Sequence, residues 1–225
     1  MKPTHALLVT SALLLGTNAS NAAIALSADP GYAAATFLTV DPDLFSPAQR
    51  NVAADRELRQ TFQLGSTIEV GRLVTGLDTQ AGDSLNGGLV VSFYEVADVN
   101  AGSWSPGTLV HTFTIPTTEA LPSTEFTIGF DFTGGDVFTL PQRNSGTEGY
   151  GMAISNADGS SNIGAWHHTN DGTNHYTAGI YYSEGGTPPN SARDMGIALY
   201  AVPEPSCLAL AGLGSLALIG TRRRR

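Results

Sequence analysis

The sequence predicts an all-β fold, an antiparallel β-sandwich of jelly-roll type with about nine strands. Two observations support this prediction. Apolar and polar residues alternate with a period of two along short segments, which is typical of strands rather than helices. Turn-forming Gly, Asn and Asp residues separate these segments, as in Asn86-Gly87-Gly88 and Asn170-Asp171-Gly172.

The expected strands are short apolar runs bounded by turn residues. In chain order they cover residues 58–64, 68–74, 89–93, 109–115, 126–132, 137–140, 150–154, 176–182 and 195–199. One short helix is also expected, from Ser46-Pro47 to Glu57, because proline is favoured at the first helical position.

The chain of 225 residues is acidic and sparsely charged, with 14% charged residues and a net charge of −9. An acidic surface does not favour phosphate backbones, so nucleic-acid binding is excluded. Five of the 11 cations, Lys2 and the last four arginines, lie near the two ends. The remaining body has no lysine, six arginines and 19 acids, and therefore a net charge of −13.

The N-terminus has the three parts of a secretory signal peptide. Lys2 precedes an apolar run at residues 6–15, and small residues follow. Ala23-Ile24-Ala25 is the preferred cleavage motif, which gives a signal peptide over residues 1–25, and Ser20-Asn21-Ala22 is the second choice. The apolar run is too short to span a membrane. The sequence therefore predicts export.

The C-terminus consists of a polar motif, a short apolar segment and a basic end. Residues 207–220 are uncharged and predict one short membrane helix that tethers the chain to the inner membrane. The basic end keeps the C-terminus in the cytoplasm and leaves the acidic body outside. The motif is Pro203, Glu204 and Pro205, and the basic end is Arg222, Arg223, Arg224 and Arg225.

This order of motif, helix and arginine cluster resembles the PEP-CTERM sorting signal. The resemblance implies that an exosortase reads the tail, a membrane transpeptidase-like enzyme of Gram-negative bacteria that make exopolysaccharide. It divides the chain into a signal peptide at 1–25, an extracellular domain at 26–202 and a sorting signal at 203–225, whose helix would be removed during sorting. The body also resembles extracellular domains found ahead of this signal, which implies a carbohydrate-binding-like sandwich without an assigned activity.

The named catalytic signatures are absent from the sequence, including the G-x-S-x-G and H-E-x-x-H motifs. The only lysine is Lys2, so the body offers no lysine as a base or nucleophile. We therefore expect a protein that is not an enzyme and needs no cofactor or metal. A polysaccharide hydrolase with a carboxylate pair stays open as an alternative, because such a pair need not be close in sequence.

The densest polar segment, residues 166–176, holds three of the five histidines. It allows a metal site, in which His167 or His168 acts together with His175. It also allows a glycan site with an aromatic ring against a sugar, or a polar hairpin with no ligand, which is the favoured interpretation. The candidate glycan contacts are Trp104, Trp166, His175 and Tyr176.

Calcium is a further alternative, because Asp/Asn-Gly loops offer oxygen ligands. The segments at 98–100, 156–158 and 170–171 do not reproduce a known calcium pattern, so ordinary turns are favoured.

The first hypothesis is a non-enzymatic cell-surface or biofilm-matrix protein that an exosortase sorts and that meets exopolysaccharide. The alternatives are a glycan-binding module, assisted by calcium or not, and a secreted polysaccharide hydrolase.

Overall fold

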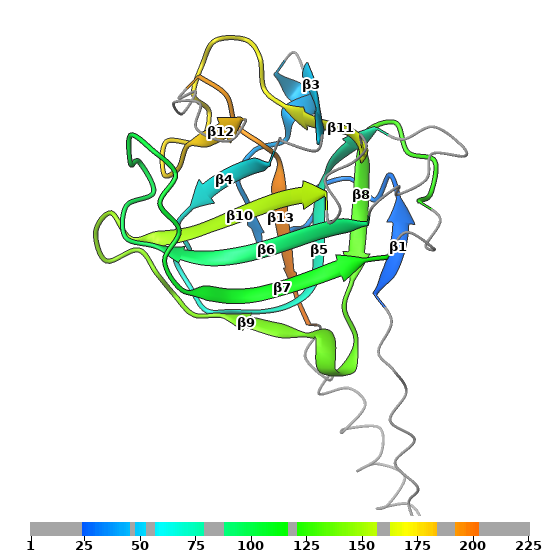
Figure 1. Cartoon of the computed structure of the whole chain (residues 1–225), viewed down its shortest axis with the longest axis horizontal. Coiled ribbons are helices and arrows are strands. Elements are labelled where there is room, and N and C mark those ends of the chain that lie inside the picture. The colour runs from blue at the N-terminus through cyan, green and yellow to red at the C-terminus, as the bar shows by residue number, and fades with distance from the viewer. Residues whose placement is uncertain are drawn as a thin grey trace, which may run out of the picture.

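The computed structural model describes residues 24–45, 48–52, 57–78, 88–116, 121–156, 163–183 and 192–202. This part of the chain forms thirteen strands and two short 3-10 helices (Figure 1). The strands are β1 (Ala25–Ala28), β2 (Phe37–Leu38), β3 (Ala48–Val52), β4 (Leu58–Phe62), β5 (Ile68–Asp78), β6 (Leu89–Val96), β7 (Leu109–Ile115), β8 (Thr127–Asp131), β9 (Phe138–Leu140), β10 (Gly149–Asn156), β11 (Ile163–His168), β12 (Tyr181–Ser183) and β13 (Ile197–Ala201). The helices are η1 (Pro42–Leu44) and η2 (Gly134–Asp136).

The strands form two antiparallel sheets. The eight-stranded sheet has the order β1-β8-β5-β11-β3, with β13 and β9 also paired to β5 and β2 paired to β13. The five-stranded sheet has the order β12-β4-β10-β6-β7. In Figure 1 the strands of the five-stranded sheet run crosswise to β8 and β13. The predicted all-β class with two antiparallel sheets is confirmed.

The core lies between the two sheets because each sheet turns one apolar side inward. Leu73 and Leu199 enter it from the eight-stranded sheet, and Phe93 enters it from the five-stranded sheet. The Phe113 ring on β7 lies 5.4 Å from the Phe130 ring on β8, so aromatic contacts join the two sheets directly. Such buried aromatic pairs add about 1 kcal/mol each to the area they bury.

The predicted helix from Ser46 to Glu57 is wrong. Residues 48–52 form strand β3, which pairs with β11. The helix prediction rested on a local capping signal, and strand pairing in the folded chain overrides such a signal because local propensity is weak.

The segment between β11 and β12 also differs from the predicted hairpin. β11 pairs with β3 and β5, whereas β12 pairs with β4 in the other sheet. The chain therefore crosses from one sheet to the other between these strands. Of the strand expected at residues 176–182, only the end belongs to a strand, β12.

The predicted sorting motif and arginine cluster, at residues 203–225, lie outside the described residues, as do residues 1–23 of the predicted signal peptide. None of the helices in the described segments is long and apolar enough to cross a membrane.

Candidate functional site

The four candidate glycan contacts do not converge on one surface. Trp166 on β11 is 1% exposed and belongs to the main core cluster. Its backbone lies opposite Leu77 of β5, and its indole Nε1 has no hydrogen-bond partner among the described residues. A buried ring offers no face to a sugar, so this burial removes Trp166 from the predicted contacts.

His175 and Tyr176 lie in the segment that crosses between the sheets. The His175 ring stacks on Phe45 with 3.7 Å between ring centroids, and its Nε2 lies 2.8 Å from Oδ2 of Asp171. This contact, followed by the Thr173 N–H, lowers the pKa of Asp171. The Tyr176 hydroxyl accepts the N–H of Gln63 at 3.1 Å. Both side chains therefore serve to fix the crossing segment.

Burial raises the pKa of Tyr176 to about 12, with the hydrogen bond that its hydroxyl accepts from the Gln63 N–H opposing the shift and Asp194 adding to it. The Tyr176 ring meets Phe37 edge to face, with 6.2 Å between ring centroids. The hydroxyl thus stays neutral at physiological pH, and the ring packs toward the core.

Asp194 binds the same segment through hydrogen bonds to its backbone. Its side chain is fully buried, and Oδ2 accepts the backbone N–H groups of His175 at 2.8 Å and Tyr176 at 3.0 Å. Its own N–H donates to the Thr169 hydroxyl at 2.9 Å. Burial raises the pKa of Asp194, and the Tyr176 and His175 N–H groups oppose that rise. Asp194 is therefore a structural anchor that the sequence pattern did not single out.

Trp104 lies half-buried on the outer face of the five-stranded sheet. Its ring centroid is 6.0 Å from the Tyr94 ring, 5.7 Å from the Tyr182 ring and 5.3 Å from the Arg59 guanidinium carbon. A Cβ at Gly151 would come within 2.5 Å of Trp104 Cη2, so the ring rests on the bare backbone of β10. Trp104 packs the 97–108 loop onto the sheet.

The residues predicted for metal binding do not form a metal site in the described part of the chain. No group of three or more His, Cys, Asp or Glu side chains there is placed to hold a metal ion. His167 Nδ1 lies 3.3 Å from Asp43 Oδ1, whereas the His175 ring contacts Phe45 and Asp171.

Two of the calcium candidates form ordinary turns. Asp98 accepts the N–H of Asn100 at 2.9 Å, and Asp171 accepts the N–H of Thr173 at 3.0 Å. Each carboxylate thus hydrogen-bonds its own backbone two residues on, as expected for an Asx turn.

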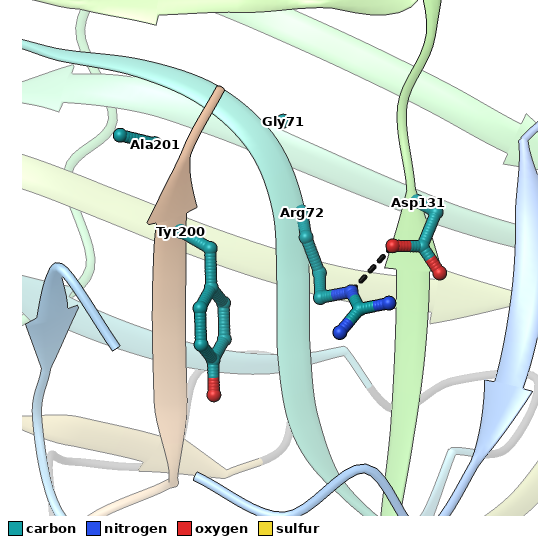
Figure 2. A pocket seen from close by; sticks show the side chains of 5 residues that line it. All are labelled: Gly71, Arg72, Asp131, Tyr200 and Ala201. Atoms are coloured by element: carbon teal, nitrogen blue, oxygen red, sulfur yellow. Dashed lines mark hydrogen bonds and ion pairs between the residues drawn. The ribbon is translucent and has the colours of Figure 1, made fainter. Parts of the chain in front are cut away.

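A hollow of about 350 Å³ lies on the outer face of the eight-stranded sheet (Figure 2). Tyr200 on β13, Arg72 on β5 and Asp131 on β8 stand opposite one another in a row across three neighbouring strands. Gly71 and Ala201 complete the lining. The pairing of β13 with β5 shifts register between Tyr200 and Ala201, which indicates a β-bulge at Gly71. Bulges re-aim side chains and occur often beside functional sites.

The polar groups of the hollow are held in place. Arg72 Nε donates to Asp131 Oδ1, and its guanidinium carbon lies 6.0 Å from the centre of the Tyr200 ring. The bond to Asp131 raises the pKa of Arg72, with burial opposing. The Tyr200 hydroxyl lies 3.2 Å from the carbonyl oxygens of both Gly31 and Ala33. In Figure 2 the guanidinium lies between the tyrosine and the carboxylate.

Chemically, this row presents an aromatic ring, the Nη groups of the guanidinium and a second carboxylate oxygen. It can bind hydroxyl groups beside an apolar surface. These residues were not among the predicted site residues, although Gly71 inside an otherwise apolar strand is a sequence signal that often marks a bulge.

The hollow lies beside the end of β13, the last described strand. The N–H of Ala201 donates to the Thr36 hydroxyl at 3.0 Å, and the N–H of Val202 donates to the Glu69 carbonyl at 2.8 Å. The backbone is thus hydrogen-bonded to the sheet up to the residue before Pro203. Strand β13, the last described strand, thus ends at Ala201, two residues before Pro203 of the predicted sorting motif.

Comparison with known protein families identifies this tail. A family model described as a PEP-CTERM protein-sorting motif matches residues 201–225. The chain thus carries a PEP-CTERM sorting motif at residues 201–225, which supports an exported protein that an exosortase sorts. No curated protein matches the chain, and no solved structure matches it.

Proposed function

We propose that the protein is a non-enzymatic component of the cell surface or extracellular matrix, delivered by an exosortase through its C-terminal signal. The observation that carries the proposal is the sorting motif directly after β13. A sorting signal joined to one compact sandwich indicates that the sandwich is the part displayed outside.

The positions of the two chain ends support a membrane-tethered intermediate. Four residues form one row across neighbouring strands of the eight-stranded sheet. In order they are Ala25 on β1, Asp131 on β8, Arg72 on β5 and Tyr200 on β13. The start of β1 and the end of β13 therefore lie at one end of the sheet, about 14 Å apart across three strand spacings. Both lie toward the lower side of Figure 1. Signals attached to these ends would bring the same end of the domain to the inner membrane.

The roles of the described acidic residues support a non-enzymatic domain. Asp194 accepts two backbone N–H groups, and Asp29 accepts those of Glu125, Phe126 and Thr127. Incubation of the purified protein with polysaccharide tests this part of the proposal. We expect no released oligosaccharide, and release that a carboxylate substitution abolishes would establish the hydrolase alternative.

Cell fractionation tests the sorting itself. Glu204→Ala alters the motif, whereas Glu69→Ala alters an exposed glutamate of the domain and serves as the matched control. We expect Glu204→Ala to lower the surface-retained fraction and Glu69→Ala to leave it unchanged. Equal retention of both variants and the original protein would contradict the proposal.

Glycan binding is the second candidate function, and the hollow at Arg72 favours it. A neutral sugar suits this site better than an acidic one, because the body carries a net charge of −13 and repels polyanions. Titration calorimetry with neutral oligosaccharides tests this candidate. We expect Tyr200→Ala to weaken binding about tenfold, equivalent to about 1.4 kcal/mol, and Tyr94→Ala on the other sheet to have no effect. Loss of binding with Tyr94→Ala alone would move the site to the Trp104 surface.

A further inference from the structure

Strand β1 is an integral part of the eight-stranded sheet. It pairs with β8 along its whole length, from Ala25 opposite Asp131 to Ala28 opposite Ile128 (Figure 1). The pairing continues past the strand, since the N–H of Asp29 donates to the Thr127 carbonyl at 2.9 Å.

The side chains of this segment are also part of the fold. Ile24 and Leu26 are partly buried and pack against the main core cluster. Directly after β1, the Asp29 carboxylate accepts the N–H groups of Phe126 at 3.0 Å and Thr127 at 3.2 Å. The described chain is thus bound to the domain from Ile24 onward.

The sequence offers two signal-peptidase motifs that differ by three residues. Cleavage after Ala25 would remove Ile24 from the core and Ala25 from the sheet. It would also place the new, charged amino group on Leu26, which packs against the core and stands opposite Phe130. Cleavage after Ala22 keeps Ile24 and all of β1, the first part of the chain that the structure describes.

We infer that signal peptidase hydrolyses the peptide bond between Ala22 and Ala23. One water molecule is consumed, leaving a carboxylate on Ala22 and an amino group on Ala23. Ser20 and Ala22 supply the small residues that the peptidase requires. The fold thus favours the motif that the sequence pattern ranks second. This inference rests on the proposed export, because only an exported chain meets the peptidase.

N-terminal sequencing of the full chain, expressed in an exporting Gram-negative host, tests the inference. The mature protein is expected to begin at Ala23. A mature protein that begins at Leu26 would overturn the assignment and leave the export proposal intact. A chain that retains Met1 in all fractions would overturn the export proposal and the assignment with it.

Two matched substitutions sharpen the test. Ala22→Leu places a large residue at the inferred cleavage position, and we expect it to abolish cleavage there or move it to another bond. Ala25→Leu makes the same change at the competing position, where Ala25 is exposed on β1 and tolerates a larger side chain. We expect Ala25→Leu to leave cleavage after Ala22 unchanged. If Ala25→Leu blocks cleavage and Ala22→Leu does not, the assignment is wrong.

Discussion

At the scale of single residues, the Asp194 side chain binds the segment that crosses between the sheets through two hydrogen bonds. Replacing it with alanine leaves the N–H groups of His175 and Tyr176 without their acceptor. We expect Asp194→Ala to lower the free energy of unfolding by about 3 kcal/mol, because unsatisfied buried donors are costly. Asp194→Asn retains an acceptor oxygen and should cost less. Urea denaturation measures both, and equal stability of Asp194→Ala and the original protein would refute this role.

His111 gives a prediction about pH. Its ring stacks on Phe138 with 4.0 Å between centroids, and burial lowers its pKa below the ordinary 6.5, with Asp136 opposing. Below that ordinary value the unfolded chain binds the proton more readily than the folded chain. Stability should therefore fall as the pH drops from about 6.5 toward the lowered pKa.

The variant His111→Phe tests this sign. Phenylalanine can keep the stack on Phe138 and does not titrate. Thermal unfolding between about pH 7.5 and about pH 5.5 should show a drop in Tm that is smaller for the variant by about 2 °C. An identical drop in both proteins would mean that His111 does not contribute.

The two tryptophans show what sequence patterns leave open. Trp104 and Trp166 were both predicted as candidate glycan contacts. One is half-buried over Gly151, and the other lies in the core. Burial of a single side chain depends on contacts between distant strands, which local patterns do not contain. The same holds for the row of Tyr200, Arg72 and Asp131, which pairing across three strands creates.

At the scale of elements, period-two alternation predicted the long strands well. The expected segments at 89–93, 109–115 and 150–154 match β6, β7 and β10. The short strands β1, β2, β3 and β11 were missed, because they are held by pairing with distant partners rather than by their own alternation. The connection from β11 to β12 was predicted as a hairpin from its turn residues. Turn residues indicate that the chain reverses, but they do not indicate which sheet the next strand joins.

A substitution at Gly179 tests how the connection from β11 to β12 packs against β4. A Cβ on this residue would lie 1.9 Å from the backbone oxygen of Thr61 in β4. We expect Gly179→Ala to lower the free energy of unfolding by about 3 kcal/mol, since backbone must move to accept the methyl group. Gly102 has no atom within 4 Å of its Cβ position, so Gly102→Ala is the matched control. Denaturant titration measures the stability of both variants. Equal stability would contradict the close packing of Gly179 against Thr61.

At the scale of the whole molecule, the charge of the chain divides between its parts. Lys2 lies in the predicted signal peptide and the terminal arginines lie in the sorting motif, while the body from residue 26 to 202 carries a net charge of −13. A strongly acidic domain stays soluble and monodisperse more easily than a neutral one. The body is thus suited to display outside the cell, and the basic ends are suited to orienting the chain during export.

The central claim is that an exosortase determines where this protein goes. The most direct measurement compares the distribution of the full chain in a Gram-negative host that has its exosortase and in the same host without it. We predict that the protein reaches the cell surface or matrix in the first host and accumulates in the inner-membrane fraction in the second. The same distribution in both hosts would contradict the claim.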